Sequence, residues 1–207
     1  MATIQGDKIR GTIGDWVYYI DPVTKEQRVR LKPKKVRNPK TSNQQAHRNA
    51  FIDIVRLSSH MTEAHLLGLH KHAQRMKLRT YTDFRHLNKD CFTPDGLIDY
   101  PRIVISRGPV APVIVNEVQL DEGHVLRLSF DACFMQYDTA PEDTFHLFVY
   151  CPALGAGLLA PPVYRSAQTV TFPLPADWPI DGLHLYAFLR NAKGWTSNTI
   201  YIPVQGR

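Results

Sequence analysis

Residues 107–112 read Arg-Gly-Pro-Val-Ala-Pro, a stretch in which the texture of the sequence changes. Two prolines and one glycine in six residues disfavour a helix or a central strand and are typical of a linker between domains. Apolar residues at helical spacing precede the stretch, and short alternating runs follow it. The sequence therefore predicts an α+β protein with one domain at residues 1–107 and a second at residues 108–207.

The second half contains six runs of β-forming residues separated by turn sequences. They cover residues 113–120, 125–130, 145–151, 169–174, 183–189 and 199–204. This pattern of short strands predicts an antiparallel β-sandwich. The half resembles immunoglobulin-like and fibronectin type III domains, a resemblance that concerns architecture and implies no activity.

The first half is predicted to be mainly helical after residue 41. Thr41 and Gln44 have the spacing of a capping box, which predicts a helix over residues 42–60. Apolar spacing predicts a second helix over residues 62–79 and a short third one over residues 82–88. Residues 102–106 read as a strand.

The N-terminus is predicted to form a basic hairpin followed by an extended arm. Residues 8–20 are rich in β-formers, and residues 28–32 read Arg-Val-Arg-Leu-Lys, so period two places three cations on one face. Trp16 and Tyr18 of the hairpin are expected to pack against the first helix, with a partner surface as the alternative. Two prolines among the cations of residues 33–40 favour an extended chain.

Charge is distributed unevenly along the chain, whose formal net charge is +6. Residues 1–107 contain 20 Lys and Arg against 10 Asp and Glu, whereas residues 108–207 contain 5 against 9. Such asymmetry indicates that the first half faces a polyanion or an acidic partner. The alternative is that the basic half docks on the acidic one, within one chain or between copies.

The candidate partner-binding or polyanion-binding residues are the cations of the hairpin and arm together with one from the first helix. They are Arg28, Arg30, Lys32, Lys34, Lys35, Arg37, Lys40 and Arg48. A phosphate backbone would favour such a run through counterion release. No aromatic residue lies between Arg28 and Lys40 to stack on bases, and a solvated basic hairpin is the remaining reading.

No catalytic, metal or cofactor site is predicted. The sequence contains no P-loop, no G-x-G-x-x-G and no G-x-S-x-G. Cys91, Cys133 and Cys151 form neither a disulfide framework nor a zinc pattern. The spacing of His60, His65, His70 and His72 scatters their rings around a surface helix. Cys91 and His86 are the only hint of a nucleophile, through proximity in sequence alone.

No run of residues approaches the length of a membrane helix, so no membrane insertion is expected. The N-terminus shows no secretory signal, so we expect a cytoplasmic protein or one assembled into a virion-like particle.

Residues 11–51 resemble an uncharacterised family that is common in Bacteroidetes. The resemblance rests on the Gly-rich hairpin from Gly11, the basic strand at residues 28–30 and an Asn-Pro-x-Thr…Gln…Arg motif. That motif is formed here by Asn38, Pro39, Thr41, Gln45 and Arg48. Ser42-Asn43 stands where a Pro-Ala pair is common in the family. A similar motif occurs in small proteins of tailed phages, so the resemblance implies an assembly role and no established activity.

The physical role of the motif is structural in the first instance. Asn38-Pro39 imposes an extended entry, Thr41 caps the helix, and Gln45 and Arg48 could hydrogen-bond the arm. The leading hypothesis is a non-enzymatic structural or assembly protein whose basic hairpin and arm engage an acidic partner or a neighbouring subunit. The alternative is a nucleic-acid-binding protein that uses residues 28–40.

Overall fold

The computed structural model describes residues 3–5, 8–21, 24–34, 38, 40–93, 95–121, 123–133 and 139–204. The protein is α+β, and its strands form three antiparallel sheets. Contacts divide the chain between Thr41 and Ser42 into two compact units. We call residues 1–41 the N-terminal unit and residues 42–207 the body.

The N-terminal unit is a four-stranded sheet in the order β1-β2-β3-β4. Its strands are β1 (Thr3–Gln5), β2 (Lys8–Ile13), β3 (Trp16–Ile20) and β4 (Gln27–Leu31). Ile13 pairs with Trp16 across a two-residue turn in which Gly14 has a φ of +56°, a conformation that favours glycine. The predicted hairpin is thus present within a larger sheet.

The strands of the body form two sheets. One has the order β10-β6-β5, and the other has the order β12-β11-β7-β8, with β9 also paired to β7. Their bounds are β5 (Ile114–Leu120), β6 (Val125–Asp131), β7 (Thr144–Cys151), β8 (Ala156–Leu159), β9 (Val163–Tyr164), β10 (Thr169–Pro173), β11 (His184–Arg190) and β12 (Ile200–Pro203). All six predicted strands of this half are present, and β8 and β9 were not predicted.

Helices precede the strands of the body. They are α1 (Ser42–His60), α2 (Thr62–Gly68), α3 (His70–Arg75) and α4 (Thr80–Asn88), with short 3-10 turns at Lys89–Cys91, Tyr100–Arg102 and Arg165–Ala167. The first helix has its predicted bounds. The predicted second helix is broken at Leu69, where the Gly68 carbonyl accepts a hydrogen bond from the Thr196 hydroxyl at 2.8 Å.

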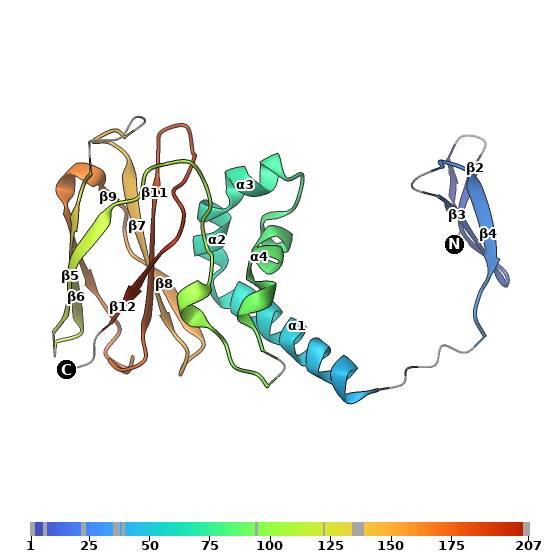
Figure 1. Ribbon diagram of the computed structural model, residues 1–207, viewed down its shortest axis with the longest axis horizontal. Helices are drawn as coiled ribbons and strands as arrows, with labels where there is room; N and C mark the ends of the chain where they lie inside the picture. The colour runs from blue at the N-terminus through green and yellow to red at the C-terminus, as the bar shows by residue number, and fades with distance from the viewer. Residues whose placement is uncertain are drawn as a thin grey trace. The chain divides into compact units, whose positions relative to one another are not determined.

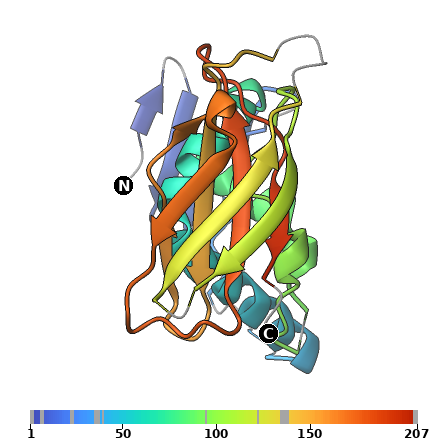
Figure 2. The ribbon, with the colours of Figure 1, turned by 90° about the vertical axis from the view of Figure 1, so that its left-hand side faces the viewer.

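The five-stranded sheet is the middle of three layers. Figure 1 shows the helices on one side of β7 and β11 and the strands β5 and β6 on the other. Viewed from the side of the three-stranded sheet, the helices lie behind both sheets (Figure 2). Leu147 and Leu185 pack into the core between the sheets, whereas Phe148 and Phe188 pack into the core beneath the helices. Both faces of the middle sheet are therefore buried.

This layering differs from the predicted division at residues 107–112. The helices share a hydrophobic core with β7 and β11, so residues 42–107 and 108–207 form one unit. The boundary lies at the end of the arm instead. Residues 107–112 connect the helices to the sandwich and are partly buried, despite their two prolines. Val110 is 2% exposed, and its N–H donates a hydrogen bond to the Thr196 carbonyl at 3.1 Å.

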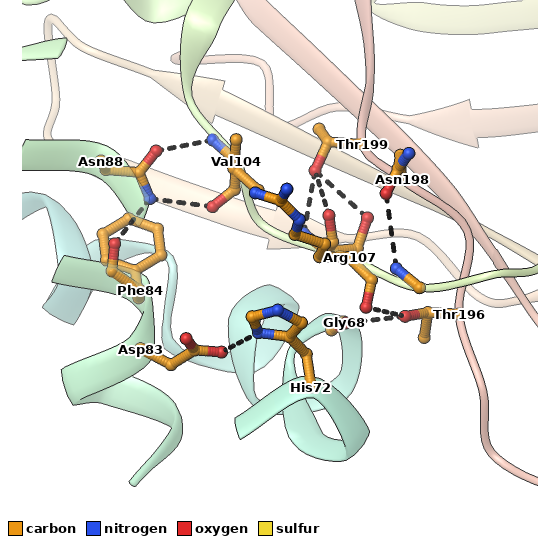
Figure 3. Close-up of polar contacts among 12 residues, drawn as sticks. Gly68, His72, Asp83, Phe84, Asn88, Val104, Arg107, Thr196, Asn198 and Thr199 are labelled. Carbon is orange, nitrogen blue, oxygen red and sulfur yellow. Dashed lines mark hydrogen bonds and ion pairs between the residues drawn. The ribbon is translucent and has the colours of Figure 1, made fainter. Parts of the chain in front are cut away.

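Side chains from two sides hold the chain segment that crosses between the helices and the sandwich (Figure 3). Asn88 donates to the Val104 carbonyl at 2.9 Å and accepts from the Val104 N–H at 2.7 Å. The Thr199 hydroxyl accepts from the N–H groups of Ile105 and Ser106 at 2.9 and 2.8 Å. The predicted strand at residues 102–106 is wrong, because side chains satisfy backbone groups that a neighbouring strand would otherwise pair.

Gly68 lies where this segment meets the helices. A Cβ atom at this position would fall on the Ile105 carbonyl oxygen and would lie 2.7 Å from the Ser106 Cβ. Only glycine allows so close an approach of the α2 backbone to the crossing segment. The close packing here explains why the helices and the sandwich cannot act as separate domains.

His146 is a titratable group buried by the middle layer, with 6% of its surface exposed. Its ring stacks on Phe188 at 5.0 Å, and its Nε2 lies 3.0 Å from the Thr144 hydroxyl. Desolvation by burial, followed by the charge of Arg190, lowers the pKa of His146 from 6.5 to about 4. Between these two values the unfolded chain binds a proton that the folded chain does not. Stability is therefore lost as the pH falls through this window.

We expect the free energy of unfolding of the body to fall by about 2 kcal/mol when the pH is lowered from about 7 to about 5, because His146 is protonated in the unfolded chain. Urea denaturation at both pH values measures the loss. The variant His146→Gln should lose much less, whereas His47→Gln, which replaces an exposed histidine of α1, should behave like the wild type. An unchanged pH dependence in His146→Gln would assign the effect to His65 and His184, whose pKa values burial also lowers.

Candidate binding surface on the N-terminal unit

Strand register gives the N-terminal sheet two chemically different faces. Trp16 lies opposite both Ile13 and Leu31, and Tyr18 lies opposite Val29. Residues that face each other in an antiparallel ladder point to the same side. Ile13, Trp16, Val29 and Leu31 therefore form one cluster, which we call the apolar patch, with Tyr18 beside it.

The opposite side carries the cations of β4. Tyr19 pairs with Arg28, and Val17 pairs with Arg30. We call the side that bears Tyr19, Arg28 and Arg30 the basic face. The alternation predicted for residues 28–31 is present, and Arg28 lies 3.3 Å from Asp21 in an ion pair with half of the arginine side chain exposed.

Both faces of this sheet are open. Within residues 8–21 and 24–34, no residue is buried. The four residues of the apolar patch are 47–62% exposed. Trp16 has 47% of its surface exposed, and its predicted packing against the first helix stays a prediction. A sheet with no buried residue lacks the apolar burial that stabilises sheets.

The other predicted binding residues lie along the arm and the start of α1. Lys32, Lys34 and Lys40 are exposed, whereas Lys35, Arg37 and Pro39 fall outside the described residues. Asn38 and Thr41 are exposed and precede α1, which begins at Ser42 as expected of a capped helix. Gln45 and Arg48 are exposed on its first two turns. Hydrogen bonding of the arm by these two side chains remains a prediction.

The net charge of the protein is located in the N-terminal unit. Residues 1–41 contain 10 Lys and Arg against 4 Asp and Glu, and residues 42–207 contain 15 against 15. The excess of +6 thus belongs to the first 41 residues. Within the body, the helical part has 10 cations against 6 anions and offsets the acidic sandwich. The charge asymmetry along the sequence therefore has two sources. One is the packing of the basic helical part on the acidic sandwich within the body, and the other is the basic N-terminal unit.

The histidines of the helical region have separate partners. His65 is buried beside Ser58, His72 lies 2.7 Å from an Asp83 carboxylate oxygen, and His60 lies 3.3 Å from the Tyr150 hydroxyl. The prediction of a histidine-rich surface helix is therefore wrong for His65. Within the described part of the chain, no three metal-ligating side chains gather in one place.

Cys91 is buried, and its thiol donates to the Arg102 carbonyl at 3.5 Å. Burial raises the pKa of Cys91 above its ordinary value, with the charge of Arg102 opposing this shift. A raised pKa disfavours the thiolate that a nucleophile requires. This arrangement is that of a packing residue.

A polar cavity of about 220 Å³ lies near the end of α1. Asp53, His60, Tyr100 and Tyr150 are among the residues that line it. Burial raises the pKa of Tyr150 to about 12 and lowers the pKa of His60. These shifts favour the neutral forms of His60 and Tyr150, so these two groups offer hydrogen bonds rather than charges to the cavity.

The body has an exposed apolar area on α1, formed by Phe51, Ile52 and Val55, which we call the helical patch. Their exposed fractions are 52%, 52% and 37%. The Arg85 guanidinium lies 5.2 Å from the centre of the Phe51 ring, over its face. This cation covers part of the patch, which distinguishes it from the apolar patch of the N-terminal sheet.

Period two in residues 28–32 predicted the basic face, whereas a partner surface at Trp16 and Tyr18 was predicted only as the alternative to packing against the first helix. The signal was present in the alternation of Trp16, Tyr18 and Ile20 in one strand and of Val29 and Leu31 in the next. What the sequence does not show is that these side chains remain exposed on the folded N-terminal sheet.

No described helix has both the length and the apolar character needed to cross a membrane. A model of a family of unknown function (DUF6266) matches residues 19–203, from the penultimate residue of β3 to the last residue of β12. No curated protein and no solved structure matches the chain. The immunoglobulin-like resemblance of the sandwich therefore remains a prediction.

Proposed function

Because the chain belongs to the family of unknown function (DUF6266), we propose its role from its own residues: a non-enzymatic binding or assembly protein. Its N-terminal sheet and arm engage an acidic surface on a partner or on a neighbouring subunit. A phage-related or bacterial assembly of the kind implied by the family resemblance is part of this proposal.

One observation carries the proposal, namely that the whole charge excess of the protein lies in a unit separate from the body. Arg28 and Arg30 project from an edge strand in which every residue is exposed. Lys32 and Lys34 continue the exposed cations into the arm. Clustered cations of this kind attract an anionic surface and accelerate association with it.

The non-enzymatic part of the proposal rests on the state of the titratable groups. The thiol of Cys91 is buried with a raised pKa, and burial shifts the pKa values of His60 and Tyr150 in the polar cavity towards the neutral forms. Catalytic groups usually have pKa values near the working pH. Burial instead moves the pKa values of Cys91, His60 and Tyr150 further away from neutral pH.

Nucleic acid is the second candidate, and the position of Tyr19 favours it. Tyr19 is 37% exposed and pairs with Arg28, so an aromatic ring lies among the cations of the basic face. Exposed aromatics beside cations form stacking platforms for single strands. The sequence analysis found no aromatic residue within 28–40, because this one comes from the neighbouring strand.

The test is binding of labelled probes to the full chain across a salt series, with an acidic peptide, single-stranded DNA, duplex DNA and RNA as probes. The variant Arg28→Glu/Arg30→Glu should bind much more weakly than the wild type, whereas Arg75→Glu/Lys77→Glu, which reverses two exposed cations of the body, should retain the wild-type affinity. For nucleic acid, loss of two phosphate contacts should reduce the salt slope by about 2.

The probes separate the two candidates. Preference for the acidic peptide supports the assembly role. Preference for single strands, weakened by Tyr19→Ala, would make nucleic-acid binding the better function. If none of the probes binds at low salt, the basic face is not a polyanion site and both candidates are wrong.

A further inference from the structure

The N-terminal sheet has an apolar face with nothing over it in residues 8–21 and 24–34. The four side chains of the apolar patch are 47–62% exposed, which leaves roughly 400 Å² of contiguous apolar surface, comparable with the largest patch on a typical monomer. None of the described residues 8–21 and 24–34 of this sheet is buried. A sheet of this kind needs a second surface packed against its apolar face to be stable.

We propose that the apolar patch packs face to face on the same patch of a second copy of this chain, so that two N-terminal sheets form a two-fold dimer. Sheets pack in this way in sandwiches, with their inner side chains interdigitating across about 10 Å. A two-fold contact uses the same surface on both copies, which an apolar patch satisfies with itself. The inference does not depend on the proposed function of the basic face.

The amount of surface is suitable for such a contact. Two patches together would remove roughly 800 Å² of apolar area from water, which is about the apolar centre of a standard interface. Trp16 lies at the middle of the row that joins Ile13 to Leu31. A large aromatic residue at the centre of an apolar surface is the usual anchor of an interface.

Charge selects the apolar side and opposes the other ways of pairing two copies. Basic face on basic face would bring Arg28 and Arg30 of two chains together, which like charges disfavour. Pairing along the edge strand β4 would align the same arginines, and charged edges oppose strand addition. In the proposed dimer both basic faces point outwards into solvent.

The chain between the sheet and the body permits the contact. Ten residues, 32–41, separate the end of β4 from the start of α1. An extended segment of that length spans at most about 33–36 Å. Two sheets can therefore meet without requiring that the two bodies contact each other.

The experiment is sedimentation velocity and light scattering of the full chain over a dilution series, at about 0.15 M and about 1 M salt. A dimer of twice the 23.6 kDa chain mass is expected at both salt concentrations, since burial of apolar surface is not screened by salt. Val29→Glu/Leu31→Glu should be monomeric. The matched control Arg30→Glu alters the same strand on the opposite face and should remain dimeric.

A second measurement on the wild type guards against unfolding of the sheet in the variant. Dilution from dimer to monomer should shift the emission of Trp16 to longer wavelength. The difference between the wild type and Trp16→Phe isolates this tryptophan from the two in the sandwich, Trp178, which is buried, and Trp195, which is partly buried.

The proposal would be overturned by a monomer at all concentrations, by a dimer that persists in Val29→Glu/Leu31→Glu, or by no change in Trp16 emission on dilution. A dimer lost in Phe51→Glu/Ile52→Glu would also overturn it, and would mean that the helical patch of a second copy covers the sheet. A dimer that dissolves in salt and is lost in Arg30→Glu would support the proposed acidic contact between subunits and exclude this one.

Discussion

Replacing Asp143 by alanine should lower the free energy of unfolding of the body by about 3–5 kcal/mol, the usual cost of leaving a buried charge without its partner. Arg165 is fully buried and Asp143 is 2% exposed, with Arg165 Nε 3.4 Å from a carboxylate oxygen. The guanidinium also donates to the carbonyls of Ala132 and Ala111 at 2.8 and 2.7 Å. Burial lowers the pKa of Arg165, and the Asp143 charge opposes this shift.

Arg165 connects three separate parts of the sandwich, since its partners lie at residues 111, 132 and 143. Urea denaturation followed by circular dichroism measures the effect of Asp143→Ala. The neighbouring variant Glu142→Ala removes an exposed carboxylate and should change stability by less than about 0.5 kcal/mol. Equal stability of the two variants would show that the guanidinium is satisfied by the carbonyls alone.

The variant Asn88→Ala should lower the free energy of unfolding by about 3–5 kcal/mol, because it removes a fully buried side chain and leaves both polar backbone groups of the half-buried Val104 without their partner. Asn88 is fully buried, and its side chain bonds the Phe84 carbonyl at 2.8 Å as well as both polar groups of Val104. These bonds join α4 to the crossing segment (Figure 3).

Chemical denaturation measures the total effect of Asn88→Ala, and amide hydrogen exchange of Val104 measures the local one. The Val104 amide should exchange much faster in the variant. Asn88→Asp keeps an acceptor for the Val104 N–H but places a carboxylate oxygen against two carbonyls, so it should also be strongly destabilised. Asn49→Ala, on the exposed side of α1, is the control and should be nearly neutral. Normal protection of Val104 in Asn88→Ala would mean that another group replaces the amide.

Local sequence patterns predicted the bounds of the elements whose structure depends mainly on their own residues. The capping residue and the apolar spacing placed the first helix at residues 42–60, where α1 is found. Alternation placed β5, β6, β10 and β12 within two residues of their bounds. In these strands the apolar residues that set the period are mostly the ones that lie in, or pack against, the core between the sheets.

The division of the chain could not be derived in the same way, since it depends on contacts distant in sequence. Residues 107–112 have the composition of a linker, yet Val110 is buried and hydrogen-bonded to Thr196. The strand β7 did carry a signal, because its residues 145–151 are all buried and do not alternate in polarity. A run of that kind indicates a strand covered on both faces, and covering the second face requires the helices.

The candidate site was predicted in part, for a related reason. Arg28 and Arg30 follow from period two in one strand, and they lie on the basic face as expected. Tyr19 joins them only through pairing with the next strand. The apolar patch likewise forms only when Ile13, Trp16 and Leu31 align across three strands. Pairing and packing between distant segments are not encoded in local patterns.

The middle sheet with two buried faces also has a consequence for the order of synthesis. The helices of residues 42–88 leave the ribosome first, but the apolar side that they share with Phe188 has no cover until β11 is made. At about 5–20 residues per second, the chain between residues 107 and 190 takes roughly 4–17 s to appear. During that time the nascent helices expose the side chains of Leu57, Met61 and Phe84. We therefore expect the growing chain to be prone to binding by holdases at this stage, and slower translation of the sandwich to prolong the exposure.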